Sequence, residues 1–74
     1  MPKDQNVYHK IAANIRKYRK AKDNMSQEDL GLAAGLNRAY VGYIERGERR
    51  PSVETLASIA KVLDVELYKL FLFE

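Results

Sequence analysis

The middle of the chain, residues 26–47, reads SQEDLGLAAGLNRAYVGYIERG and has the pattern of two short helices joined by a tight turn. Ser26, followed three residues later by Asp29, is a variant of the capping box that opens a helix. Gly35 predicts the end of that helix, because glycine enters a left-handed turn without steric cost. Asn37 is a favourable cap for the helix that follows.

The spacing of small and apolar residues within this segment predicts a helix-turn-helix. Counted from Gln27, the fifth residue is small, where two helices approach closely, and the ninth is a glycine, where the chain turns. Positions four, eight, ten, fifteen and eighteen are apolar and are expected to pack the helices together: Leu30, Ala34, Leu36, Val41 and Ile44. A helical hairpin meets some of these conditions by chance, but meeting all of them is specific.

The segments on either side of this pair also read as helices, and no segment alternates as a strand does. Before the pair, apolar residues recur at the period of one helical face: Val7, Ile11, Ile15 and Tyr18. After the pair, a helix with Ser52 as its cap is expected to bury one face: Leu56, Ile59, Ala60 and Leu63. A last helix is expected at about residues 66–72. The prediction is one compact all-α domain of five helices over residues 1–74, with residues 1–6 disordered.

The composition excludes several classes of function. The chain has no cysteine and one histidine, so no disulfide, metal site or cofactor is expected. No glycine-rich phosphate loop or carboxylate cluster is present, and an enzyme is therefore not expected. The longest apolar run, residues 70–73, is far shorter than the roughly 20 residues that span a bilayer. We expect a cytoplasmic protein with neither a membrane segment nor a small-molecule ligand.

The net charge of +3 is unevenly distributed along the chain. Residues 1–25 carry seven Lys and Arg against two Asp, residues 26–50 carry four of each sign, and residues 51–74 carry two Lys against four acids. A basic N-terminal third and an acidic C-terminal third favour a polyanion partner that binds to one side of the molecule. A solvated helix face with no partner is the equally weighted alternative.

The sequence resembles the lambda-repressor/Cro-like helix-turn-helix family, the bacterial and phage transcription factors also called the xenobiotic-response-element type. The resemblance covers about residues 11–70 and is most specific at 44–47, IERG, and at 51–52, PS. Within the family, residues 36–41, LNRAYV, are similar to the controller proteins of restriction–modification systems, which are stand-alone homodimers of about this size. Gly31 departs from the family, which usually has alanine there.

The resemblance implies sequence-specific binding of double-stranded DNA, with the second helix of the motif, about residues 37–46, in the major groove. Arg38 is expected to pair with the O6 and N7 acceptors of guanine, and Ala39 to touch a thymine methyl. Other residues are expected to contact bases or phosphates: Ser26, Gln27, Asn37, Tyr40, Tyr43, Arg46, Arg49 and Arg50. Arg46, near the end of the helix, is expected to contact the DNA backbone or to pair with Glu45 or Glu48. Glu45 is expected to pair with a nearby arginine.

The C-terminal segment, LYKLFLFE at residues 67–74, holds more apolar side chains than one helical stripe buries. Apolar surface gathered at one end marks an interface. A homodimer is therefore predicted, with two recognition helices about 34 Å apart on a palindromic or pseudo-palindromic operator. The expected interface residues are Leu67, Leu70, Phe71 and Phe73. A last helix folded entirely onto its own core is the alternative.

Two functions from different classes remain open at the level of the sequence. The first is a homodimeric transcriptional regulator, repressor or activator, and in its narrowest form a restriction–modification controller. The second is a protein-interaction module or antitoxin-like partner that uses the same fold, in which Arg38 and Arg46 have no DNA role. Salt distinguishes the two, because binding to phosphates weakens as salt rises.

Overall fold

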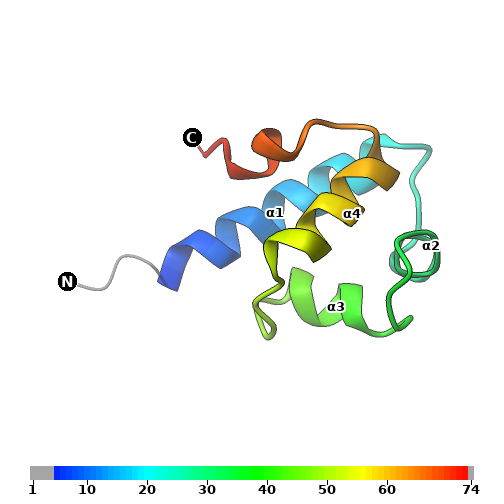
Figure 1. The fold of residues 1–74 in the computed structure, drawn as a ribbon, viewed down its shortest axis with the longest axis horizontal. Helices are drawn as coiled ribbons and strands as arrows, with labels where there is room; N and C mark the ends of the chain where they lie inside the picture. The colour runs from blue at the N-terminus through cyan, green and yellow to red at the C-terminus, as the bar shows by residue number, and fades with distance from the viewer. Residues whose placement is uncertain (1–4, 74) are drawn as a thin grey trace.

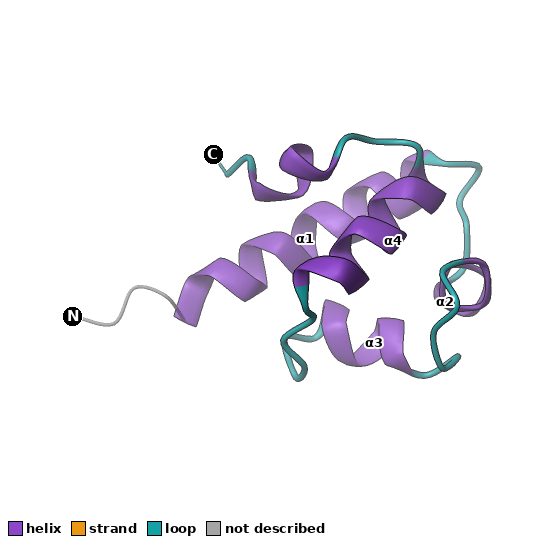
Figure 2. Ribbon diagram, in the orientation of Figure 1, coloured by secondary structure: helices purple, strands orange, loops and turns teal. Residues whose placement is uncertain are grey.

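The computed structural model describes residues 5–73, which form four α-helices and one short 3₁₀ helix (Figure 1). The α-helices are α1 (Gln5–Ala21), α2 (Gln27–Ala33), α3 (Tyr40–Glu45) and α4 (Val53–Leu63), and the 3₁₀ helix is η1 (Leu67–Phe71). Figure 2 shows loops between these helices and no strand within the described residues. The all-α fold class predicted from the sequence is confirmed. None of the helices in this part of the chain is long and apolar enough to cross a membrane.

The other elements pack around α1, the longest helix. α3, α4 and η1 contact α1, and α2 packs against α3 and α4. The chain after α4 runs back along α1, so that the C-terminal residues lie beside the first helix (Figure 1). Apolar side chains from all five elements meet in one core: Ile11, Ile15, Leu30, Val41, Ile44, Leu56, Ile59, Ala60, Leu63 and Leu70.

The predicted capping residues begin two of the helices. The Ser26 Oγ accepts a hydrogen bond from the Asp29 backbone N–H at 2.9 Å, and it caps α2. The Ser52 Oγ accepts from the Thr55 N–H at 3.1 Å, and it caps α4. Each cap satisfies one of the amide groups that the first turn of a helix leaves without an intrahelical partner.

Two glycines end α2 and α3 in the left-handed conformation that the sequence predicts. Gly35 has φ = 75° and Gly47 has φ = 76°. At Gly47 space is restricted as well, because an added Cβ would lie 2.5 Å from the imidazole of His9. Gly31 has a different role: it lies where α2 crosses α3, and a Cβ added there would lie 3.5 Å from the Val41 Cγ2, which leaves room for a small residue. The small residue expected at this crossing is therefore confirmed.

The fifth predicted helix is wrong in type, because η1 is a 3₁₀ helix. The Lys69 N–H donates to the Glu66 carbonyl at 3.0 Å, a bond between residues three apart. Short helices of this type are common at the ends of α-helices and as connectors. The disorder predicted for residues 1–6 falls mainly on residues 1–4, outside the described residues, and Gln5 and Asn6 belong to α1 instead.

Candidate nucleic-acid interface

The inner side of α3 is fixed by a buried carboxylate, Glu45, whose side chain is fully enclosed. The Arg19 guanidinium of α1 donates from Nε to Oε2 at 2.7 Å and from Nη2 to Oε1 at 2.9 Å. The Gln27 Nε2 of α2 donates to the same Oε1 at 2.9 Å, and the Arg16 Nε lies 3.5 Å from it. Glu45 therefore joins α1, α2 and α3, which confirms the arginine pairing expected for this residue.

The ionisation of Glu45 follows from these partners. Burial alone would raise the pKa of the Glu45 carboxyl, because it removes the charged form from water. The hydrogen bonds from Arg19 and Gln27, and the positive charges of Arg19 and Arg16, outweigh burial and lower the pKa below its ordinary value. Glu45 is thus a carboxylate at neutral pH, and its negative charge helps to hold α3 against α1.

The outer side of α3 and the residues on either side of it form a surface, which we call the recognition surface: Asn37, Arg38, Ala39, Tyr40, Tyr43, Arg46, Arg49 and Arg50. All are exposed except Tyr40, which is half-buried and packs on the core. A hollow of about 460 Å³ lies on this surface, lined by Asn37, Ala39, Tyr40, Tyr43 and Arg49. Five of the residues predicted to contact DNA therefore surround one hollow.

Three arginines of the recognition surface lie over aromatic rings. The guanidinium carbons of Arg46 and Arg49 are 5.2 and 5.4 Å from the centre of the Tyr43 ring. The Arg50 guanidinium is 5.3 Å from the ring centre of Tyr8, on α1. Such cation–π contacts orient the arginines while their N–H groups stay accessible to solvent.

Two arginines of the recognition surface also pair with acids. The Arg38 Nη2 forms an ion pair with the Glu28 carboxylate of α2, and both side chains are largely exposed. The Arg46 Nη2 lies 3.1 Å from Glu48 Oε1, which is one of the partners the sequence suggests for Arg46. Arg38 is therefore not simply solvated, although its exposed side chain remains open to a ligand.

The predicted start of the recognition helix is too early. The Asn37 Oδ1 accepts from the Ala39 N–H at 2.9 Å, and the Tyr40 N–H bonds to the Asn37 carbonyl at 2.9 Å. These bonds form a turn, so regular α3 begins only at Tyr40. Gln27, predicted beside a phosphate, instead uses its amide N–H on Glu45, and Ser26 is exposed at the start of α2.

Two residues of this region were missed by the sequence reasoning. Arg19 is only 8% exposed, and it follows Ile11 and Ile15 at the same helical spacing. A cation on the apolar face of a helix is the signal that points to a buried acidic partner. Glu28 gave no such signal, because its contact with Arg38 depends on how two helices cross.

Residues 15–70, more than half of the chain, match the family described as Helix-turn-helix. The chain belongs to the helix-turn-helix family. The match includes α2 and α3, which carry the recognition surface, and it extends to Leu70 in η1. The resemblance seen in the sequence is thereby confirmed.

Named relatives of this helix-turn-helix protein are regulators. Control protein C.SmaI from Serratia marcescens is 43% identical over 60 residues, covering 81% of this chain and 70% of its own. The crystal structure of the restriction–modification controller protein C.AhdI from Aeromonas hydrophila superposes with a TM-score of 0.81 at 39% identity, covering 86% of this chain and 96% of its own. The hypothetical transcription factor NHTF from Neisseria superposes with a TM-score of 0.89 at 33% identity, covering 99% and 83%.

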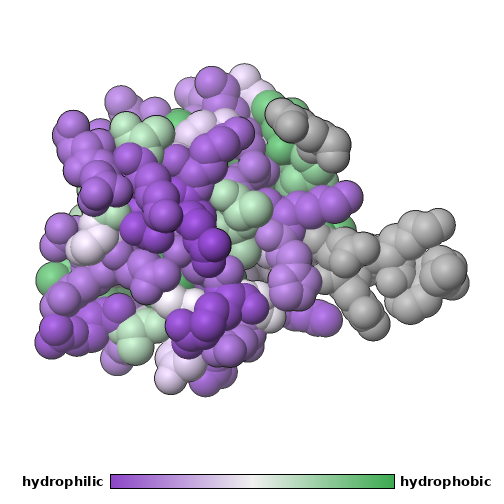
Figure 3. Space-filling model, turned by 180° about the vertical axis from the view of Figure 1, so that it is seen from behind, coloured by the Kyte–Doolittle hydropathy of each residue, from purple (hydrophilic) through white to green (hydrophobic). Residues whose placement is uncertain are grey.

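The C-terminal residues of this helix-turn-helix protein divide between core and surface. Leu70 is fully buried within its own chain, so its assignment to a dimer interface is wrong. Leu67 is half-buried and packs on the core. Phe71 and Phe73 are 39% and 37% exposed, beside the exposed Leu72. In the view from behind, green apolar side chains gather at this end of a mostly hydrophilic surface (Figure 3).

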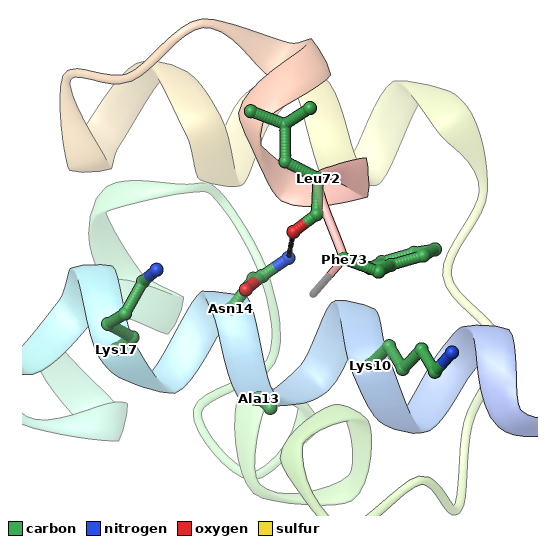
Figure 4. A pocket seen from close by; sticks show the side chains of 6 residues that line it. All are labelled: Lys10, Ala13, Asn14, Lys17, Leu72 and Phe73. Carbon is green, nitrogen blue, oxygen red and sulfur yellow. Dashed lines mark hydrogen bonds between the residues drawn. The ribbon is translucent and has the colours of Figure 1, made fainter.

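One side chain of α1, Asn14, holds this C-terminal segment. Its Nδ2 donates to the Leu70 carbonyl at 2.9 Å and to the Leu72 carbonyl at 3.1 Å. Beside it lies a hollow of about 320 Å³, lined by Lys10, Ala13, Asn14, Lys17, Leu72 and Phe73 (Figure 4). The Lys10 Nζ lies over the face of the Phe73 ring, 5.5 Å from the centre of the ring. The apolar end of the chain therefore has a defined position against α1.

Proposed function

We propose that this chain is a sequence-specific double-stranded DNA-binding protein that regulates transcription as a homodimer. The observation that carries the proposal is the two-sided setting of α3. Its inner side is fixed by Val41, Ile44 and Glu45, and its outer side presents the recognition surface. A rigidly held helix that exposes arginines and aromatics suits the major groove. We propose binding and regulation in the cytoplasm, with no catalytic activity.

The proposed roles of the residues follow their positions. Arg38 precedes α3 and reads guanine, while the neighbouring Ala39 contacts a thymine methyl. Tyr40 and Tyr43 offer hydroxyl groups and rings to bases and phosphates. Three further residues contact the phosphate backbone and position the protein on the duplex: Ser26, Arg49 and Arg50. Arg46 keeps its pair with Glu48. Asn37 lines the hollow together with Ala39, Tyr40, Tyr43 and Arg49.

The proposed dimer uses the exposed apolar residues at the C-terminal end. Phe71, Leu72 and Phe73 lie together on the surface, where their exposure to water is unfavourable. We propose that a twofold axis passes through this surface, with the two copies of α3 about one DNA turn apart on a palindromic or pseudo-palindromic operator. C.SmaI and C.AhdI are named as a control protein and a restriction–modification controller, so we propose that the regulated operon belongs to a restriction–modification system.

Selection of bound sites from a pool of random duplexes tests this function directly. A palindromic consensus is the expected result. Affinity for the selected site should fall with salt, with a log–log slope of about −0.9 for each phosphate contact. Arg38→Ala should lower that affinity by roughly 1–3 kcal/mol, whereas Lys61→Ala, in the last turn of α4, is the control and should change it little.

Salt-insensitive binding that Arg38→Ala leaves unchanged would contradict the DNA proposal. It would favour the alternative from the sequence, a protein-interaction module or antitoxin-like partner. Failure to recover any consensus, with binding that depends on salt alone, would restrict the function to non-specific DNA binding.

A further inference from the structure

The two arginines that pair with acids on the recognition surface have their charge partly neutralised. Arg38 is bonded to Glu28 through Nη2, and Arg46 is bonded to Glu48 through Nη2. In both pairs the side chains of the arginine and the acid are about half exposed or more. An exposed ion pair is weak and exchanges readily with other partners. Even when the direct contact is broken, the acid is a near neighbour of the arginine and places a negative charge close to it.

The other two arginines of this surface differ. Within residues 5–73, no acid lies within ion-pair distance of Arg49 or Arg50. Their guanidinium groups lie over the rings of Tyr43 and Tyr8 instead. Since a ring leaves the positive charge in place, Arg49 and Arg50 supply attraction to any phosphate, whatever the base sequence.

We propose that Glu28 is a specificity-determining residue, which directs Arg38 to base edges and away from phosphates. This inference rests on the proposed function. The pair with Glu28 uses the Nη2 end of the Arg38 guanidinium. Arginine has further N–H donors on Nη1 and Nε, and these remain for a second acceptor.

The chemistry of that second acceptor decides which ligand Arg38 takes. The O6 and N7 atoms of guanine are neutral, so they can accept from Arg38 while Glu28 remains beside it. A phosphate is an anion, and at the same guanidinium it would meet the Glu28 carboxylate, which repels it. Glu28 therefore weakens the contact of Arg38 with a phosphate more than its contact with guanine. Weakening the binding to the wrong partner increases specificity.

The test compares Glu28→Gln with Asp29→Asn. Both changes remove one negative charge from the first turn of α2, but only Glu28 pairs with Arg38. Each variant is titrated with the duplex that the wild-type protein selects and with a scrambled duplex of the same composition. Glu28→Gln should raise affinity for the scrambled duplex about two- to fivefold and steepen its salt slope by up to about 0.9. Asp29→Asn should affect both duplexes equally.

A second background separates this effect from general charge. With Arg38→Ala present, Glu28→Gln should act as Asp29→Asn does, because no guanidinium remains to be directed. Repeating the site selection with Glu28→Gln should weaken the base preference at the position that Arg38 reads. An unchanged ratio of specific to non-specific affinity in Glu28→Gln would overturn this inference and leave the proposed function standing. Wild-type protein that binds no duplex would overturn the proposed function itself.

Discussion

Arg19 and Glu45 connect α1 to α3 by two parallel hydrogen bonds, of 2.7 and 2.9 Å, between side chains that are almost entirely buried. α3 has only six residues, and a helix of that length is not stable alone in water. Its position is therefore determined by the core beneath it and by this ion pair. The Arg19 Nη1 also donates to the Met25 carbonyl at 2.7 Å, which ties in the loop before α2.

Glu45→Gln should destabilise the fold in a way that depends on pH. At neutral pH the loss should be about 3 kcal/mol, because the buried Arg19 is left without its counter-charge. The pKa of Glu45 is lowered in the folded protein, so its contribution is fully present above the unfolded value of about 4.3. The contribution is lost as the pH falls through the folded pKa. Urea unfolding of both proteins across a pH series measures the difference, and a difference that does not shrink as the pH is lowered from neutral into the acid range would contradict this account.

Gly31→Ala should stabilise the protein by about 0.5–1 kcal/mol, because alanine is the better helix former. The added Cβ would lie 3.4 Å from the Asn37 carbonyl oxygen and 3.5 Å from the Val41 Cγ2, which is ordinary contact. The melting temperature should rise by several degrees, roughly 4–8 °C for each kcal/mol. Gly35→Ala is the control: it has open space but φ = 75°, so it should lower the melting temperature. A lower melting temperature for Gly31→Ala would show that α2 and α3 cannot accommodate a methyl group.

Phe71→Glu should shift the protein from dimer to monomer without unfolding it, because Phe71 is a surface residue of the C-terminal end. Sedimentation equilibrium measures the mass, and circular dichroism checks the fold. Leu70→Ala provides the contrast, since Leu70 is fully buried in its own core and its truncation should cost about 2–5 kcal/mol of stability. An unchanged mass for Phe71→Glu would count against this end of the chain as the dimer contact.

Asn14→Asp should release the C-terminal segment from α1. The substitution keeps the shape of the side chain but removes the donor that serves the Leu70 and Leu72 carbonyls. The loss should be about 1–3 kcal/mol locally, since the carboxylate also faces those carbonyl oxygens. Hydrogen exchange should become faster in residues 69–73 and stay the same in α2 and α3. Equal exchange in both proteins would mean that apolar packing alone holds the segment.

Much of the helix-turn-helix was predictable because its signals are local. Ser26 and Ser52 cap the helices that follow them, and Gly35 and Gly47 end the helices before them. The apolar positions of the motif are also set by spacing within one segment. Leu30, Val41 and Ile44 are buried, and Ala34 and Leu36 pack against the core.

The C-terminal segment was predicted with the wrong period. In an α-helix Leu67, Leu70 and Phe71 share a face, but a 3₁₀ helix has three residues per turn. With that period Leu67 and Leu70 align on the inner side, and Phe71 turns outward. The segment is also bonded at the Leu70 carbonyl by Asn14, which lies 56 residues away in the sequence, and local periodicity gives no sign of such a contact.

The partners of charged residues were predictable only where they are close in sequence. Arg46 and Glu48 are two residues apart and pair as suggested. Arg19 and Glu45 are 26 residues apart, and Arg38 and Glu28 lie on opposite sides of the turn. Composition and periodicity describe single helices, whereas these pairs depend on how the helices cross.

Asn14 and Arg19 belong to the same helix, one holding the C-terminal segment and the other holding α3. They are five residues apart, or about 7.5 Å along the axis. In the proposed dimer, α1 would rigidly connect the C-terminal segment, which contacts the other subunit, to α3, which contacts the major groove. The spacing between the two α3 helices would then be set by helices rather than by loops. A rigid spacing would make the dimer bind weakly to an operator whose half-sites are displaced by one base pair.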